Sequence, residues 1–271
     1  MKSLRPDNEA AKDTTLLLAR FMTEFSFQIA RSEAEREQAF RLRHDVYCEE
    51  IKGIPPTDPV RRLEYDIFDN EALHCLVRHR TTGLTAACTR LVTPLPGADA
   101  PLDRLPLQSY AEESLYDSPL HPDQATRGSF YEISRLAISP HFRPTLKGKQ
   151  ACGHSSSPDQ ARFRDRRTFS FLANALFLSG CAVGRLTGTH LAYAMMEPRL
   201  HRLLSMSGFH FTQVGGEIDL HGKRRAYCIS RKQAEAGMNP QLVPLYQHIQ
   251  KQLSEQLEST SRLPQTAATN L

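Results

Sequence analysis

The sequence predicts an α/β domain with a mixed central sheet and helices on both of its faces. Short apolar runs of strand length alternate along the chain with longer stretches of helical periodicity. Two of the short runs are joined by the turn Thr81-Thr82-Gly83, which is typical of a hairpin. The predicted order is helix, strand, hairpin, central strand, long helix, strand, helix and further strands, and this order describes an α/β domain.

Turns and helix end signals predict the elements of the first half. Ser32 followed by Glu35 resembles a capping box, so a helix should open there and run to about Glu50. Gly53 and the pair Pro55-Pro56 end that helix. The other elements expected in this half are a helix over residues 14–25, strands over 27–30, 73–78 and 84–92, an irregular stretch over 93–128 with one short helix near 107–115, and a central strand over 131–138.

The same signals predict the second half. Residues 141–157 are rich in Gly, Ser and Lys and indicate a polar loop. Gly215-Gly216 and His221-Gly222 are expected to separate the last strands. The elements expected here are helices over 162–183, 198–207 and 240–257 and strands over 189–196, 209–214, 217–220 and 225–230. We divide the chain into an N-terminal segment with a helix (1–26), a main domain (27–231) and a C-terminal helix with a polar tail (232–271).

Composition narrows the class of protein. An apolar content of 40% and a charged content of 24% are typical of a soluble globular protein. The net charge of +4 is mild and the basic residues are scattered, which argues against a nucleic-acid partner. The six cysteines form no C-x-x-C pair, so we expect no metal site. The polar N-terminus and the lack of an apolar run near ~20 residues predict a cytoplasmic protein without an integral membrane segment.

Charged residues interrupt three segments that otherwise resemble core. Such residues are costly to bury unless they are paired, so three segments carrying them indicate one shared polar cluster. A solvated edge is the alternative for each acid alone, and a structural ion pair is the alternative for the third segment. The residues of this cluster are Arg43, then Glu64, Asp66 and Asp69, then Arg90, and finally Glu132 with Arg135.

Two further features complete the candidate site. Glu132 and Arg135 lie three residues apart in a strand and would face opposite sides, so both can join one site only if a bulge re-aims one of them. The basic segment after the central strand suits the phosphates of an acyl donor, although a solvated basic loop is the alternative. Its candidate donor-binding residues are Arg143, Lys147, Gly148 and Lys149.

The charged segments resemble the acyl-homoserine-lactone (autoinducer) synthase family over residues 27–140. The matching stretches are FRLRHDVY with Arg43, LEYDIFDN with its three acids, TRLVTP with Arg90, and YEISRLAI with Glu132 and Arg135. The chain departs from that family in one respect, because it has no Trp and so lacks the Gly-Trp that follows the family's first helix.

Over residues 27–230 the chain resembles the acyltransferases associated with PEP-CTERM/exosortase systems, which are relatives of N-acyl amino acid synthases. The stretch LAYAMMEPRLHRLLSMSGFHFTQVGGEIDLHGKRRAY carries this resemblance. It implies a GNAT (acyl-CoA N-acyltransferase) fold and transfer of a fatty acyl group to an amine. The donor would be a thioester of acyl carrier protein or CoA, and no cofactor would be bound permanently.

The resemblance also implies roles for the cluster. Catalysis is assigned to Glu64, Glu132 and Arg135, and binding of the small-molecule amine, expected to be an amino acid, to Arg43, Asp66, Asp69 and Arg90. Replacing Glu64 by Gln or Arg135 by Ala is then expected to cost at least ~100-fold in turnover with the fold intact. Three alternatives stay open: homoserine-lactone synthesis from S-adenosylmethionine, a non-catalytic acyl or carrier sensor, and a domain whose ion pairs serve only stability.

Overall fold

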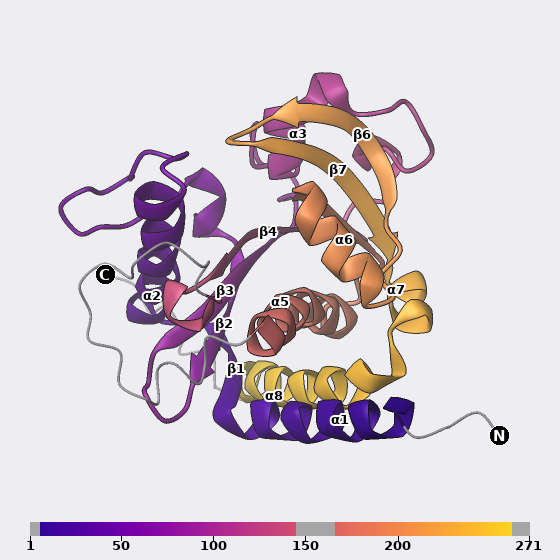
Figure 1. Cartoon of the computed structure of the whole chain (residues 1–271). Helices are drawn as coiled ribbons and strands as arrows, with labels where there is room; N and C mark the ends of the chain where they lie inside the picture. Colours follow the sequence, from indigo (N-terminus) through magenta and orange to yellow (C-terminus); the bar gives the residue numbers. More distant parts are fainter. Residues whose placement is uncertain (1–5, 145–165, 262–271) are drawn as a thin grey trace.

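The computed structural model describes residues 6–144 and 166–261, and its elements follow the predicted order (Figure 1). The strands are β1 (Phe25–Ala30), β2 (Leu73–His79), β3 (Thr85–Val92), β4 (Phe130–Ile138), β5 (Leu191–Met196), β6 (Thr212–Asp219) and β7 (Lys223–Ser230). The α-helices are α1 (Pro6–Glu24), α2 (Glu33–Arg43), α3 (Pro106–Ala111), α5 (Arg166–Leu186), α6 (Pro198–Met206), α7 (Arg231–Gly237) and α8 (Val243–Ser261). A π-helix, His44–Glu50, continues α2.

The seven strands form one mixed sheet in the order β1-β2-β3-β4-β5-β7-β6. β4 and β5 are parallel, and the other neighbouring strands are antiparallel. The predicted hairpin is the β2–β3 pair, and the predicted central strand is β4. The prediction of a mixed sheet with helices on both faces is therefore confirmed.

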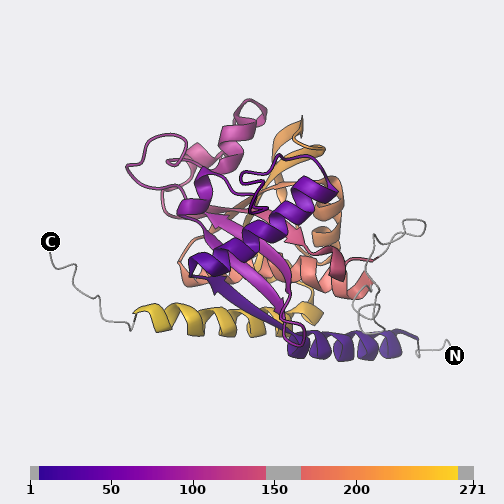
Figure 2. The same cartoon turned by 90° about the vertical axis from the view of Figure 1, so that its left-hand side faces the viewer.

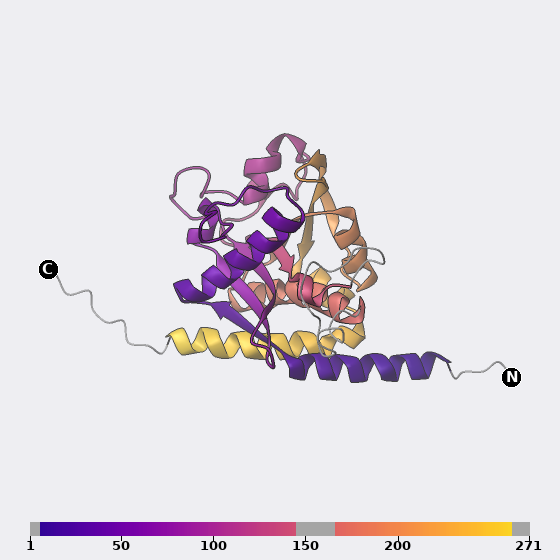
Figure 3. The same cartoon turned by 60° about the vertical axis from the view of Figure 1, so that its left-hand side comes forward.

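The helices divide between the two faces of the sheet. α5 packs on β2, β3 and β4, α8 lies beside α5 and packs on β1, and α1 runs beside α8. α2 crosses the opposite face (Figures 1 and 3). The free ends of α1 and α8 point in opposite directions (Figure 2). One stretch, Arg167–Leu186 of α5, is long and apolar enough to cross a membrane, which differs from the expectation of no such run. Most of this stretch is buried, as expected of a core helix, so it is weak evidence for a membrane span.

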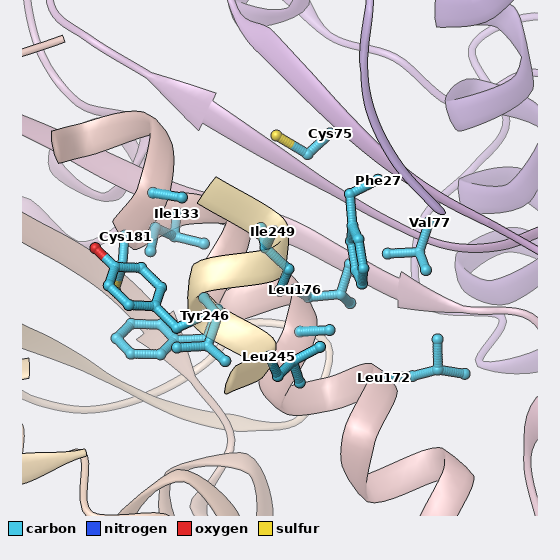
Figure 4. Packing of buried hydrophobic residues seen from close by; sticks show 14 of the residues in the cluster. Phe27, Cys75, Val77, Ile133, Leu172, Leu176, Cys181, Leu245, Tyr246 and Ile249 are labelled. Atoms are coloured by element: carbon cyan, nitrogen blue, oxygen red, sulfur yellow. The ribbon is translucent and has the colours of Figure 1, made fainter. Parts of the chain in front are cut away.

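The main core forms where α5 and α8 pack against the sheet (Figure 4). Strand residues Phe27 and Val77 face Leu176 of α5 and Ile249 of α8 in this cluster. Gly180 lets α5 approach β4 closely, because a Cβ atom at this position would stand 2.6 Å from the Ile133 side chain. The polar cluster therefore has to lie on the other face, which α2 covers.

Several predicted boundaries were wrong, for identifiable reasons. Residues 209–220 do not form two strands, because Gly215-Gly216 lies within β6, where the backbone of Ser114 comes close. Helix α7 was missed although Ser230 and Gln233 form a capping box at its start. Helix α1 begins at Pro6, before the predicted start, and α5 ends at Leu186, after the predicted end. Most of the predicted 141–157 loop lies outside the described residues.

The sheet opens between its two parallel strands. β4 and β5 pair only at Phe130–Leu191, Tyr131–Ala192 and Glu132–Tyr193 in the described structure. Past Glu132, β4 keeps β3 as its partner and β5 keeps β7. Glu132 therefore stands at the point where the two strands part.

The backbones of Gly208 and Gly237 are in close contact where they cross, so a side chain added at Gly208 should destabilise the fold. Gly208 has φ +93°, and a Cβ atom there would overlap the carbonyl oxygen of Gly237. We expect Gly208→Ala to lower the free energy of unfolding by about 2–3 kcal/mol, measured by urea denaturation. Gly83→Ala is the control, because Gly83 has φ +69° but open space around it, and should cost only ~1 kcal/mol. Equal costs at both positions would contradict the role of the crossing.

Candidate active site

A β-bulge in β4 brings Arg135 to the same face as Glu132. The β3–β4 register shifts between Cys88 and Arg90, so that two residues, Arg135 and Leu136, oppose one residue of β3. Arg135 takes up the left-handed conformation, with φ +53°. The bulge predicted from the three-residue spacing of Glu132 and Arg135 is therefore present.

Three arginines and three carboxylates close a ring of alternating charge. Each acid bridges two arginines: Glu64 joins Arg43 to Arg135, Asp66 joins Arg135 to Arg90, and Asp69 joins Arg90 to Arg43. The shortest N–O distances of the six pairs lie between 2.5 and 3.1 Å. We call these six residues the charge ring. The three positive and three negative charges balance, which makes burial of the ring tolerable.

The charge ring has a buried side and a partly exposed edge. Arg43, Glu64, Asp69 and Arg90 are buried, and each is at most 3% exposed. The side chains of Asp66 and Arg135 are 17% and 19% exposed. A small molecule from solvent would therefore reach the ring at the Asp66–Arg135 edge.

The segment with the three acids is not a strand. Glu64 follows an irregular loop, and its own backbone N–H donates to the Phe40 carbonyl oxygen of α2 at 3.2 Å. Asp66 caps the 3₁₀ turn Ile67–Asn70, and Asp69 accepts a hydrogen bond from the Asp66 backbone N–H at 2.7 Å. This reciprocal capping competes with an extended conformation, so residues 66–70 form a capped turn.

The ring keeps two of its carboxylates, Glu64 and Asp69, ionised. Burial raises the pKa of Glu64, but Arg43 and Arg135 outweigh it and leave this pKa below its usual value. For Asp69 burial likewise raises the pKa, and Arg43 and Arg90 bring it well below the usual range. A carboxylate held in this way by two arginines is a poor proton acceptor, because protonation breaks both ion pairs.

Glu132 has the opposite character. It is buried, and its Oε2 accepts a hydrogen bond from the Leu107 backbone N–H of α3 at 2.7 Å. Burial raises its pKa to about 7, against the lowering effects of Leu107, Arg90 and Arg135. A carboxyl group with a pKa near 7 can both take up and release a proton at neutral pH.

One donor of the ring is unused. Arg90 donates through Nε to the Ser134 hydroxyl at 3.1 Å and through Nη1 to Asp66. Its Nη2 is buried and has no hydrogen-bond partner within the described part of the chain. A buried guanidinium N–H without an acceptor is costly, so an oxygen atom from a ligand or water fits here.

Four residues near the ring escaped sequence reasoning. Ser134 shares a strand face with Glu132 and could have been found from that two-residue spacing. His74 lies 3.4 Å from the Asp69 carbonyl oxygen, and burial lowers its pKa to about 4. Tyr110 of α3 lies close enough to Asp66 and Arg135 for both to influence its pKa, which burial raises. Leu107 binds Glu132 through its backbone N–H, and the residue type at that position does not indicate such a contact.

Of the predicted acyl-donor residues, the structure describes Arg143, which is not part of the ring. Arg143 forms an ion pair with Glu50, at the end of the π-helix. Lys147, Gly148 and Lys149 lie outside the described residues, so their role stays a prediction. The structure thus brings together Arg43, Glu64, Asp66, Asp69, Arg90, Glu132 and Arg135 from the predicted set, with Glu132 beside the ring rather than in it.

Comparisons with known proteins agree with this architecture. A model of the acetyltransferase (GNAT) domain matches residues 42–147. The solved structure of the AHL synthase LasI is similar, with a TM-score of 0.54, 14% identity, and coverage of 79% of this chain and 96% of that one. No curated protein sequence matches the chain.

Two further solved structures share the fold. One is FeeM, an N-acyl amino acid synthase from uncultured soil microbes, with a TM-score of 0.51, 14% identity, and coverage of 79% of this chain and 94% of that one. The other is BjaI, a CoA-dependent acyl-homoserine lactone synthase with SAM and isopentyl-CoA, with a TM-score of 0.54, 18% identity, and coverage of 83% and 89%. The domain match and the sheet confirm the predicted GNAT fold and class the chain as an acyltransferase.

Proposed function

We propose that the chain is an N-acyltransferase that moves a fatty acyl group from a thioester to the amine of an amino acid. One observation carries this proposal. Glu132, a buried carboxyl group with a pKa of about 7, stands where β4 and β5 part and beside the charge ring. The proton acceptor therefore lies next to both the opening in the sheet and the arginines of the charge ring.

Glu132 is the general base of this proposal. The amine attacks the thioester carbonyl, the C–N bond forms and the C–S bond breaks. The amine loses one proton, which Glu132 accepts, and the departing thiolate gains one, so the step balances without a redox partner. Glu64 was an equal candidate from the sequence, but two arginines hold its carboxylate. Its role in the proposal is to keep Arg43 and Arg135 in place.

The gap between β4 and β5 would receive the thioester. Strand β4 has no β5 partner past Glu132 in the described structure, so backbone groups on that side are free of strand pairing. A backbone N–H aimed at the thioester carbonyl stabilises the negative charge that develops on its oxygen. The bulge at Arg135 lies in this same stretch. The acyl donor would be carried by acyl carrier protein or CoA, held in part by Arg143, Lys147, Gly148 and Lys149.

The acceptor would be an amino acid rather than a polyamine. All six ring residues pair with one another. Among the described residues, the buried Nη2 of Arg90 is left as a donor for an anionic oxygen. An α-carboxylate placed there would set its amine near Glu132, since Arg90 also acts on the pKa of Glu132. Of the two arginines assigned to the acceptor from the sequence, Arg43 is already held by Glu64 and Asp69, so Arg90 is the one proposed to bind the α-carboxylate.

We further propose, from the resemblance of residues 191–227, that the chain is related to the acyltransferases of PEP-CTERM/exosortase systems. Homoserine-lactone synthesis is the second candidate, favoured by the likeness of the fold to LasI and BjaI. The absence of Trp argues against it. The two candidates differ in whether S-adenosylmethionine is consumed.

Product analysis tests the proposal. The purified chain is incubated with acyl-CoA or acyl carrier protein and a mixture of amino acids, with and without S-adenosylmethionine. Mass spectrometry should find an N-acyl amino acid, together with free thiol, that the Glu132→Gln variant does not form. A lactone formed only with S-adenosylmethionine would establish the second candidate. Donor binding without thiol release would instead indicate a sensor and contradict the proposal.

A further inference from the structure

The phenol of Tyr47 connects the end of α2 to the bulge in β4. Its hydroxyl donates a hydrogen bond to the Leu136 carbonyl oxygen at 2.7 Å. Leu136 follows Arg135 and belongs to the two-residue stretch that opposes one residue of β3. Bulged residues leave the regular ladder of a sheet, so a side-chain partner at this carbonyl helps to define the conformation of the bulge.

The π-helix is what puts Tyr47 there. Ile51 donates its N–H to the Val46 carbonyl oxygen, five residues back, at 2.9 Å, which widens the turn that contains Tyr47. Wide turns of this kind occur frequently at functional sites. Tyr47 packs against the small core cluster on the α2 face of the sheet. The π-helix continues α2 directly after Arg43, so one continuous helix supplies both an arginine of the charge ring and the contact to the bulge.

The bulge needs such contacts because its backbone is strained. Arg135 has a side chain larger than glycine and φ +53°, a conformation that persists only where the surroundings hold it. Glu64 and Asp66 hold the Arg135 guanidinium at 3.1 and 2.9 Å. Tyr47 holds the backbone one residue further along. Thr89 adds a longer contact, 3.3 Å from its hydroxyl to the Ser134 carbonyl oxygen.

We propose that Tyr47 is a positioning residue whose hydroxyl holds the β4 bulge, and with it Arg135, in place beside Glu132. This inference rests on the proposed function, in which Glu132 accepts the amine proton. Among the described residues, the groups that act on Glu132 include Arg90 from β3, Arg135 from β4, Asp66 from the acidic segment, and the Leu107 N–H from α3. If Arg135 moves away, Glu132 loses one positive neighbour, and its proton is held more tightly.

The test is Tyr47→Phe, which removes one oxygen atom and keeps the ring. We expect kcat for acyl transfer to fall on the order of tenfold. In the wild-type protein the rate should rise with pH as Glu132 loses its proton, and in Tyr47→Phe this rise should move to higher pH. A loss of stability alone does not produce such a shift. Hydrogen exchange at the backbone amides of residues 132–138 should become faster, because the bulge opens more often.

Tyr131→Phe is the matched control. Its hydroxyl also donates to a backbone carbonyl, that of Gly180 at 3.1 Å, but on the opposite face of the same strand. This variant should leave the pH of this rise in rate unchanged. An unchanged pH of the rise and unchanged exchange in Tyr47→Phe would overturn the inference. If the wild-type protein turned over no donor and acceptor pair, the proposed function would fail, and the exchange measurement would still decide whether Tyr47 holds the bulge.

Discussion

Replacing Glu132 by Gln should lower kcat by at least ~100-fold while the protein remains folded. The amide oxygen of Gln can still accept the hydrogen bond from the Leu107 N–H, so the contact with α3 survives. The substitution removes only the ability to take a proton. Single-turnover measurements with a saturating donor would show the loss in the chemical step.

The pH dependence identifies the group. Burial raises the pKa of Glu132 to about 7, so the wild-type rate should rise with pH through this value as the base loses its proton. The acceptor amine also loses a proton, at a higher pH than Glu132, and the rise in rate from that deprotonation should persist in Glu132→Gln. The residual activity of the variant should not show the rise in rate near pH 7.

The pH dependence of stability gives an independent check, because the free energy of unfolding should fall with pH where the rate rises. A carboxyl group whose pKa is higher in the folded than in the unfolded protein destabilises the fold as pH rises through the interval between the two values. Because of Glu132, the free energy of unfolding of the wild-type protein should decrease as the pH rises from about 4.5 to 7. The Gln variant should lack this decrease. Glu112→Gln, at an exposed glutamate paired with Arg104, is the control for both measurements. Near-normal turnover in Glu132→Gln would remove Glu132 from the role of base.

Much of the site was predictable because burying charge is so costly. Arg43, Arg90 and Glu132 stood out as charges in core-like segments, and the need for partners implied that these segments meet. The bulge followed from geometry, since Glu132 and Arg135 cannot share a face of a regular strand. The fold class followed from element order, because each helix and strand carried its own periodicity.

The rest depended on contacts between distant segments. The Leu107 N–H that binds Glu132 lies in the first turn of α3, and a backbone donor there is the same for any residue type except proline. Gly215-Gly216 indicated a turn, but these glycines serve a close approach of Ser114. Sequence also left Glu64 and Glu132 as equivalent bases. The difference between them is the number of arginines that each one contacts, which only coordinates show.

Opening the charge ring should have the largest effect on stability. In Glu64→Gln, Arg43 Nε and Arg135 lose an ionised partner while Arg43 stays buried. Removing one partner of a buried ion pair typically costs 3–5 kcal/mol, so we expect a loss of about this size in urea denaturation at pH 7. The sequence expectation that Glu64→Gln leaves the fold intact is therefore revised, and lost activity in this variant does not by itself identify a base.

A matched surface glutamate separates burial from charge. Glu217 also bridges two cations, Lys223 at 2.8 Å and Arg225 at 3.0 Å, but it lies at the surface of the β6–β7 hairpin. Glu217→Gln should change the unfolding free energy little, and added salt should reduce even that change, because solvent screens exposed pairs. The cost of Glu64→Gln should persist in salt. Similar small costs at both positions would mean that solvent reaches the ring, and the argument that Glu64 is too tightly held to serve as the base would then fail.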